Sequence, residues 1–231
     1  MSKIRYLTVF FGLALLVGCA GQNPVGDPTV RVENVKKSGF LADYSMLRPG
    51  AEGETTHVYW NEGADFATYK AVIIDPVTIW LAPGSSLKDV PPKERLQLAN
   101  VFHAALVNEL SKDFRIVNSP GPGTMRVRVA LTGAEESTPA LDTISTYIPQ
   151  ARMLQAAVTV GSDTAGFVGE ATAEGEVRDS QTGELLAAGV DRRAGTKAIG
   201  DSTFDSWGDA RDAFVAWAQQ FSANLKKRQG G

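Results

Sequence analysis

A short apolar run, Tyr6–Val17, ends just before a glycine and the only cysteine of the chain, Cys19. Lys3 and Arg5 precede the run and give it a positively charged start. A helix that spans a membrane needs about 20 apolar residues, so this run is too short to span one. A basic start, a short apolar run and a small residue before a cleavage point are typical of a secretory signal peptide. We therefore expect residues 1–18 to be a leader that takes no part in the folded body.

The residues Leu16, Val17, Gly18 and Cys19 resemble the lipobox of bacterial lipoproteins. In such proteins the cysteine sulfur receives a diacylglyceryl group, the leader is cleaved before that cysteine, and the new amine takes an acyl group such as palmitate. We assign the first three residues to signal-peptidase recognition and Cys19 to lipidation, because a thiol is the nucleophile this chemistry needs. Two or three acyl chains on one residue give permanent anchoring. The alternative is an ordinary signal peptide with a chance cysteine.

The resemblance also implies a location. In lipoproteins of this kind an aspartate after the cysteine often marks retention in the inner membrane, and this chain has Ala20 there. We therefore expect an outer-membrane protein with its body in the periplasm. Residues 19–36 are rich in glycine and proline, which predicts a flexible lipidated tether. With Cys19 lipidated, no thiol remains for a disulfide, so stability must come from the hydrophobic core.

Length and charge restrict the possibilities for the chain beyond the tether. Residues 37–228 are enough for one substantial core, which we favour over two small domains. The chain has 23 Lys and Arg against 26 Asp and Glu, and its one basic cluster is the tail Lys226-Lys227-Arg228. This composition disfavours nucleic-acid binding. The expected partners are the membrane, through the anchor, and an envelope protein or the cell wall.

Several segments have the β-branched and aromatic content or the alternating pattern of strands. The expected strands are His57–Asn61, Ala71–Trp80, Phe114–Val117, Met125–Leu131, Leu154–Val160, Phe167–Arg178 and Glu184–Arg193. Between the last two, Gly183 is expected to supply the positive φ of a hairpin turn.

Two longer segments have the spacing of amphipathic helices. In the first, which starts near Pro92, the expected buried stripe is Leu96, Ala99, His103, Leu106 and Leu110, with Phe102 beside it. In the second, it is Trp207, Ala210, Phe214, Trp217, Phe221 and Leu225. The order of elements predicts an α+β fold with a mainly antiparallel, mixed sheet and two helices packed on one face. The first helix would lie in a parallel crossover.

The segment Ser38–Leu47 has apolar residues on one face of a short helix, which we expect to hold the tether against the body. Its sequence, Ser-Gly-Phe-Leu-x-Asp-Tyr-Ser-x-Leu, together with the lipobox, resembles a family of proteobacterial outer-membrane lipoproteins catalogued as a domain of unknown function. Asp179–Leu186 and the tryptophan-rich last helix are similar to that family too. The resemblance supplies no catalytic residues.

Between Pro139 and Pro149 the pattern of strands is interrupted. Long connections without secondary structure are often functional. We therefore expect a recognition loop in this part of the chain, next to an acidic pair. Its candidate residues are Glu135, Glu136, Leu141, Ile144, Tyr147 and Ile148.

The sequence lacks the familiar motifs of catalysis and metal binding. It has no Gly-x-Ser-x-Gly elbow, no phosphate-binding loop and no His-Glu-x-x-His. The two histidines, His57 and His103, have no partners at metal-ligand spacing, so we expect neither a metal nor a cofactor. A triad assembled in space around either histidine stays open. The candidate carboxylates for a glycosidase are Glu135, Glu136, Glu174 and Glu176, of which the last two are expected on a solvated strand face.

These patterns favour a non-catalytic accessory or scaffold lipoprotein that binds an envelope partner through a sheet edge or the candidate loop. One alternative is an envelope hydrolase acting on glycan or ester substrates. Another is a protein that binds small lipids or sugars, and its sign would be a sizeable apolar pocket under the last helix.

Overall fold

The fold comes from a computed structural model, which describes residues 29–32, 35–135, 170–195 and 207–230. The helices are α1 (Pro92–Leu110), α4 (Gly208–Arg228) and the 3-10 turns η1 (Phe66–Thr68) and η2 (Ser86–Lys88). The strands are β1 (Thr29–Arg31), β2 (Arg48–Pro49), β3 (His57–Trp60), β4 (Ala71–Ile74), β5 (Thr78–Ile79), β6 (Arg115–Ile116), β7 (Thr124–Glu135), β8 (Glu170–Asp179) and β9 (Leu185–Gly195).

The strands form one mixed sheet in the order β2-β3-β9-β8-β7-β4-β6, with β1 paired to β9 and β5 to β7. The β2–β3, β3–β9, β8–β9, β7–β8 and β1–β9 pairs are antiparallel. The strands β4 and β5 run parallel to β7, and β4 also runs parallel to β6. The chain leaves β4 through β5 and α1 before it returns to the sheet, so α1 lies in the expected parallel crossover.

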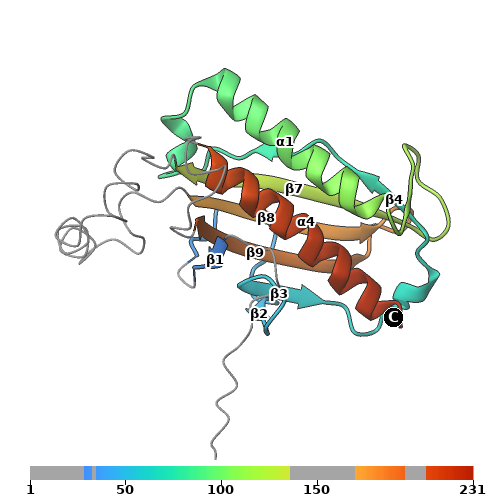
Figure 1. Ribbon diagram of the computed structural model, residues 1–231. Coiled ribbons are helices and arrows are strands. Elements are labelled where there is room, and N and C mark those ends of the chain that lie inside the picture. Colours follow the sequence, from blue (N-terminus) through green and yellow to red (C-terminus); the bar gives the residue numbers. More distant parts are fainter. Residues whose placement is uncertain (1–28, 33–34, 136–169, 196–206, 231) are drawn as a thin grey trace, which may run out of the picture.

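Both long helices cover the same face of the sheet, called here the inner face (Figure 1). The ring of Phe102 on α1 stacks on the ring of Phe214 on α4, with centroids 4.7 Å apart, and both rings are buried. Aromatic residues bury large apolar areas, so this contact places the main core between the helices and the sheet. The predicted α+β fold is confirmed.

Most of the stripe expected for the first helix is buried, as Ala99, Leu106 and Leu110 show, but its first member is not. Leu96 was expected in the core but is 61% exposed, whereas Leu98 and Phe102 are each 2% exposed. The run contains leucines at both positions, and the packing of Phe102 on α4 selects the face with Leu98. His103, expected on the same stripe, is only partly buried.

The expected strand Ala71–Trp80 is divided into β4 and β5 at Pro76. Proline has no N–H and cannot donate to a strand ladder, so the pairing stops there. Both halves pair with β7, since the N–H of Asp75 donates to Val127 O and that of Trp80 donates to Leu131 O. The β8–β9 hairpin turns at Gly183, which has the expected positive φ of 74°.

Candidate functional site

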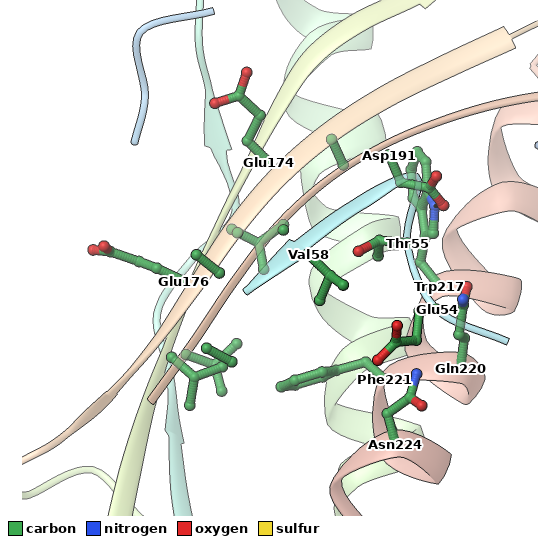
Figure 2. Close-up of a pocket in the computed structure, with 18 of the residues that line it drawn as sticks. Glu54, Thr55, Val58, Glu174, Glu176, Asp191, Trp217, Gln220, Phe221 and Asn224 are labelled. Atoms are coloured by element: carbon green, nitrogen blue, oxygen red, sulfur yellow. Dashed lines mark hydrogen bonds between the residues drawn. The ribbon is translucent and has the colours of Figure 1, made fainter. Parts of the chain in front are cut away.

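A cavity of about 110 Å³ lies between the inner face of the sheet and the second half of α4 (Figure 2). Its walls come from β3, β7, β8, β9 and both long helices. The apolar side chains of the walls are Val58, Trp60, Phe102, Leu106, Val127, Val129, Ala173, Val177, Ala187, Trp217 and Phe221. An apolar cavity of this kind is a favourable place for an apolar ligand.

Two neighbouring positions on the inner face, both beside the cavity, carry no side chain. Gly175 on β8 lies directly opposite Gly189 on β9. A Cβ on Gly189 would come within 2.8 Å of Thr55 Oγ1, so close approach of that side chain explains this glycine. A Cβ on Gly175 would lie 3.4 Å from its two nearest atoms, and the φ of Gly175 is not positive. Alanine would therefore fit at position 175, where glycine leaves the cavity open.

Polar residues line the side of the cavity between α4 and the segment before β3. They are Glu54, Thr55, Gln220 and Asn224. Asn224 Nδ2 donates a 2.8 Å hydrogen bond to Gly53 O, which ties the helix to that segment. Thr55 Oγ1 donates to His57 O at 3.0 Å. The amide oxygen of Asn224 and the amide nitrogen of Gln220 have no partner among the described residues, so both groups are available to a ligand.

The charge of Glu54 is balanced within the protein. Its carboxylate accepts hydrogen bonds from Arg48 at 2.9 and 3.2 Å, from Ala51 N at 3.0 Å and from Trp60 Nε1 at 3.1 Å. Burial acts to raise the pKa of Glu54, but the hydrogen bonds from Arg48 and Ala51 outweigh it, so the pKa lies below its ordinary value. Glu54 is therefore ionised at neutral pH and fixes the segment before β3.

A second balanced carboxylate, Asp191 on β9, lies beside Trp217 and is almost fully buried. It accepts hydrogen bonds from Thr56 N at 2.8 Å, from the Thr56 hydroxyl, from Trp217 Nε1 at 2.7 Å and from Arg193 Nε at 3.2 Å. Arg193 in turn donates to the side chain of Gln220. Buried charges are tolerated when they are paired and hydrogen-bonded, as they are here.

The outer face of the sheet contradicts one expectation. Glu174 and Glu176 were expected to be solvated, but they are 1% and 6% exposed. Both point away from the cavity (Figure 2). Glu176 pairs with Arg128 at 2.5 Å and Arg178 at 2.9 Å. Glu174 is covered by the segment Ser38–Leu47, a contact across more than a hundred residues that local alternation does not reveal.

The segment Ser38–Leu47 forms turns where a short helix was expected. Leu41 is buried against Ala188 and Val190 on the outer face of the sheet. The N–H of Ser38 donates to Glu174 at 2.7 Å, and the Tyr44 hydroxyl donates to it at 2.5 Å. The same hydroxyl accepts hydrogen bonds from two backbone N–H groups, at 2.8 and 3.2 Å. The expected helix was wrong, but the segment does pack on the body.

Burial and the neighbouring Glu174 carboxylate both raise the pKa of Tyr44, because the phenolate would be desolvated and repelled. Tyr44 therefore stays protonated and remains a donor. Next to it, the rings of Phe40 and Trp80 meet edge to face at 5.6 Å, and Trp80 Nε1 donates to Ser38 O at 3.1 Å.

The two histidines do not meet. His57 is on β3 opposite Val190, and His103 is on α1, which covers the inner face. Within the described ranges, no three metal-ligating side chains gather as a candidate metal site. None of the helices in those ranges is long and apolar enough to cross a membrane.

Most of the site residues predicted from the sequence lie outside the described residues. These are Leu16, Val17, Gly18, Cys19, Glu136, Leu141, Ile144, Tyr147 and Ile148. Glu135 is the last residue of β7 and pairs with Glu170, the first of β8. Glu170 pairs in turn with Ala194 on β9, which is opposite Val30 on β1. Glu135, from which the candidate loop starts, and Val30 on β1 thus lie in one row of paired residues across the sheet.

Sequence reasoning did not single out the cavity residues Glu54, Gln220 and Asn224, and it interpreted the inward-facing Gly175 only as a sign of a helix close to the sheet. A glycine inside a strand is the one local signal, because it indicates a bulge, a close approach or a ligand. The polar residues come from segments far apart in the chain, so no spacing connects them.

Comparison with known proteins gives a family and three distant structures. Residues 36–221 match the family described as "Protein of unknown function (DUF3313)". No curated protein matches the chain.

The PelC dodecamer from Paraburkholderia phytofirmans shares 11% identity over 71% of this chain and 96% of its own, with a TM-score of 0.40. A hypothetical protein from Chlamydia trachomatis shares 10% over 70% and 96%, with a TM-score of 0.37. A DUF4136 family protein from Bacteroides thetaiotaomicron shares 8% over 73% and 94%, with a TM-score of 0.33. Similarity at this level carries no information about function.

Proposed function

The chain belongs to the DUF3313 family of proteins of unknown function, and we propose that it is a lipid-anchored outer-membrane lipoprotein. In this proposal acyl chains on Cys19 hold the body in the periplasm. The body acts there as a non-catalytic accessory or scaffold that binds an envelope partner. The basic start and short apolar run, the resemblance of Leu16–Cys19 to a lipobox and the lack of a familiar catalytic motif in the sequence support this proposal.

One observation carries the proposal: the row of residues at one end of the sheet. Thr29, the first residue of β1, is opposite Gly195, and Glu135 is opposite Glu170 in the same part of the sheet. Figure 1 has β1 and the start of β8 at the end away from the C-terminus. A tether that enters through β1 and the candidate recognition loop would therefore share one end of the body.

Chain length then limits how far that end can stand from the membrane. About ten residues separate Cys19 from Thr29, which reach at most about 35 Å when fully extended. The docking of Ser38–Leu47 on Glu174 gives the tether a second attachment to the body. A body fixed in this way would present its loop to partners close to the outer membrane.

Site-specific photo-crosslinking in cells tests the partner. A photoreactive amino acid would replace Tyr147 in the candidate loop or, as a matched control, the exposed Gln181 in the β8–β9 turn at the opposite end of β8. We expect an envelope protein or cell-wall fragment to be captured from position 147 and not from position 181. With the photoreactive amino acid kept at position 147, replacing the other apolar candidates Leu141, Ile144 and Ile148 by serine should remove the product while the protein keeps its cellular level.

Unchanged capture after these serine replacements would remove the loop from the proposal. Capture of the same partner from both positions would show that the crosslink reports proximity alone. Either result would leave the anchor itself to be judged separately, from the chemistry of Cys19.

A second candidate function, the binding of small lipids or sugars, is favoured by a specific observation. The apolar cavity lies under the last helix, which is where a pocket was expected for this function. A ligand-binding body and an anchored scaffold are compatible, since the described residues that line the cavity do not include Glu135, from which the candidate loop starts.

A further inference from the structure

We propose that the cavity under α4 binds the end of an uncharged aliphatic chain, with a neutral hydrogen-bonding group at the polar side. This inference deepens the second candidate function and does not depend on the lipid anchor. It commits to an aliphatic ligand over a sugar because the surface that the walls present to the cavity is almost entirely apolar.

The size of the cavity limits the ligand. An engineered apolar cavity of about 150 Å³ in another protein holds one benzene molecule. The present cavity, at about 110 Å³, is smaller than that and suits a slender chain of about four carbons. Each buried methylene contributes about 0.8 kcal/mol, so even a short chain gains measurable affinity.

Gly175 also points to a ligand. Glycine inside a strand is less favourable than alanine by about 0.5–1 kcal/mol, and protein interiors are normally close-packed. Neither the backbone conformation nor a close neighbour requires glycine at this position. Gly175 thus leaves an empty space between buried valines on β7 and β8. A ligand that occupies this space would explain why the position is glycine.

The polar residues at one side of the cavity favour an uncharged ligand. Glu54 and Asp191 are already balanced by Arg48 and Arg193, so neither carboxylate offers the cavity an unpaired charge. The carboxylate of a fatty acid would lie near Glu54 without a cation of its own. A hydroxyl or ester could instead use the amide groups of Gln220 and Asn224, which are partly exposed beside the cavity.

Methyl NMR with 1-hexanol as the probe tests the proposal. The mature chain, residues 19–231, would be produced without the leader and with Cys19→Ser, so that it cannot be acylated and needs no detergent that could fill the cavity. Four valines line the cavity, and their methyl signals report on the site. Val215, which is exposed on α4 and does not line the cavity, reports on the surroundings. The four are Val58, Val127, Val129 and Val177. We expect saturable shifts of these signals and none at Val215.

Variants and a second probe separate the causes. Gly175→Val fills the cavity and should weaken hexanol binding at least tenfold, and Gly175→Ala at least threefold, so the smaller variant serves if the larger one does not fold. Gly133→Ala changes a glycine of β7 that does not line the cavity and should bind as the parent does. Hexanoate should bind at least tenfold more weakly than hexanol.

Three results would overturn the inference. The first is no saturable shift of the cavity valines with hexanol. The second is binding to Gly175→Ala and Gly175→Val as tight as to the parent. The third is hexanoate binding as tightly as hexanol, which would contradict the uncharged ligand. None of these results depends on whether Cys19 is lipidated in cells.

Discussion

The Tyr44 hydroxyl donates a 2.5 Å hydrogen bond to the carboxylate of Glu174, a residue 130 positions further along the chain. The bond joins the segment that follows the tether to the middle of the sheet. Because Glu174 is almost fully buried, the hydrogen bonds that its carboxylate oxygens accept from Tyr44 and from the N–H of Ser38 replace those that water would make. The tether is thereby fixed to the body by one buried polar contact and by the apolar packing of Leu41.

Replacing Tyr44 by Phe should therefore lower the free energy of unfolding by about 2 kcal/mol, the typical contribution of a hydrogen bond to a charged group. Urea denaturation gives the value. Limited proteolysis should also cut the segment Ser38–Leu47 faster in the variant, because the segment loses its main polar attachment.

Tyr59→Phe is the matched control for this prediction. Tyr59 packs against the same outer-face cluster, but its hydroxyl makes no hydrogen bond within the described part of the chain. We expect a change within about 0.5 kcal/mol. Equal effects of Tyr44→Phe and Tyr59→Phe would contradict a special role for the bond to Glu174.

This contact also shows what local pattern can and cannot predict. The alternation in β8 correctly separates Ala171, Ala173 and Val177 from Glu174 and Glu176. It does not reveal which face is covered, because the cover on the outer face comes from a segment more than a hundred residues earlier. The alternation thus placed both glutamates on the correct face of the sheet, but the expectation that this face is exposed to solvent was wrong.

The two facing glycines should respond in opposite ways to alanine. Gly175→Ala should raise the free energy of unfolding by about 0.5–1 kcal/mol, because its Cβ has room and the unfolded chain loses freedom. Gly189→Ala should lower it by about 1–3 kcal/mol, because its Cβ meets Thr55 Oγ1 at 2.8 Å. Thermal and urea unfolding of both variants are the measurements.

Removing the Thr55 hydroxyl tests whether it causes the cost of Gly189→Ala. In a Thr55→Ala background, the cost of Gly189→Ala should shrink, since the nearest atom is gone. An unchanged cost, or stabilisation by Gly189→Ala alone, would contradict the account of why this strand position is glycine.

The different burial of Phe102 and Leu96 on α1 makes a third prediction. Phe102→Ala should cost about 3–5 kcal/mol, because it removes a buried ring that stacks on Phe214. Leu96→Ala should change stability by no more than about 0.5 kcal/mol, because Leu96 is exposed. A large loss with Leu96→Ala would restore the stripe that the sequence suggested.

Stability at high pH should depend on Tyr69. Burial and the hydrogen bond to Asp179 raise the pKa of Tyr69 from 10.0 to about 12. The folded state therefore keeps its proton where the unfolded state has lost it, and the contribution of Tyr69 is complete below pH 10. It should be lost as the pH rises toward 12. In urea denaturation at several pH values, Tyr69→Phe should show a shallower decline above pH 10 than Tyr59→Phe, and equal slopes would contradict it.

The fold was more predictable than the site. Helix spacing, strand alternation and the turn at Gly183 are local signals, and they gave the α+β class and the packing of both helices on one face. Pro76 is visible in the sequence and indicates that strand pairing is disturbed there. It does not indicate that both halves, β4 and β5, pair with β7. The cavity depends on Gly175 facing Gly189 and on α4 crossing above them, and both are tertiary relationships.

Mass spectrometry of the native protein, purified from membranes, tests the central claim most directly. The account predicts an N-terminal peptide that begins at Cys19 and carries a diacylglyceryl group on sulfur and an acyl chain on the amine. It also predicts that Cys19→Ala leaves the leader uncleaved and the cysteine-specific lipid absent. An unmodified Cys19 thiol in the native protein, or a native chain that still begins at Met1, would contradict the lipid anchor and the proposed location at the outer membrane.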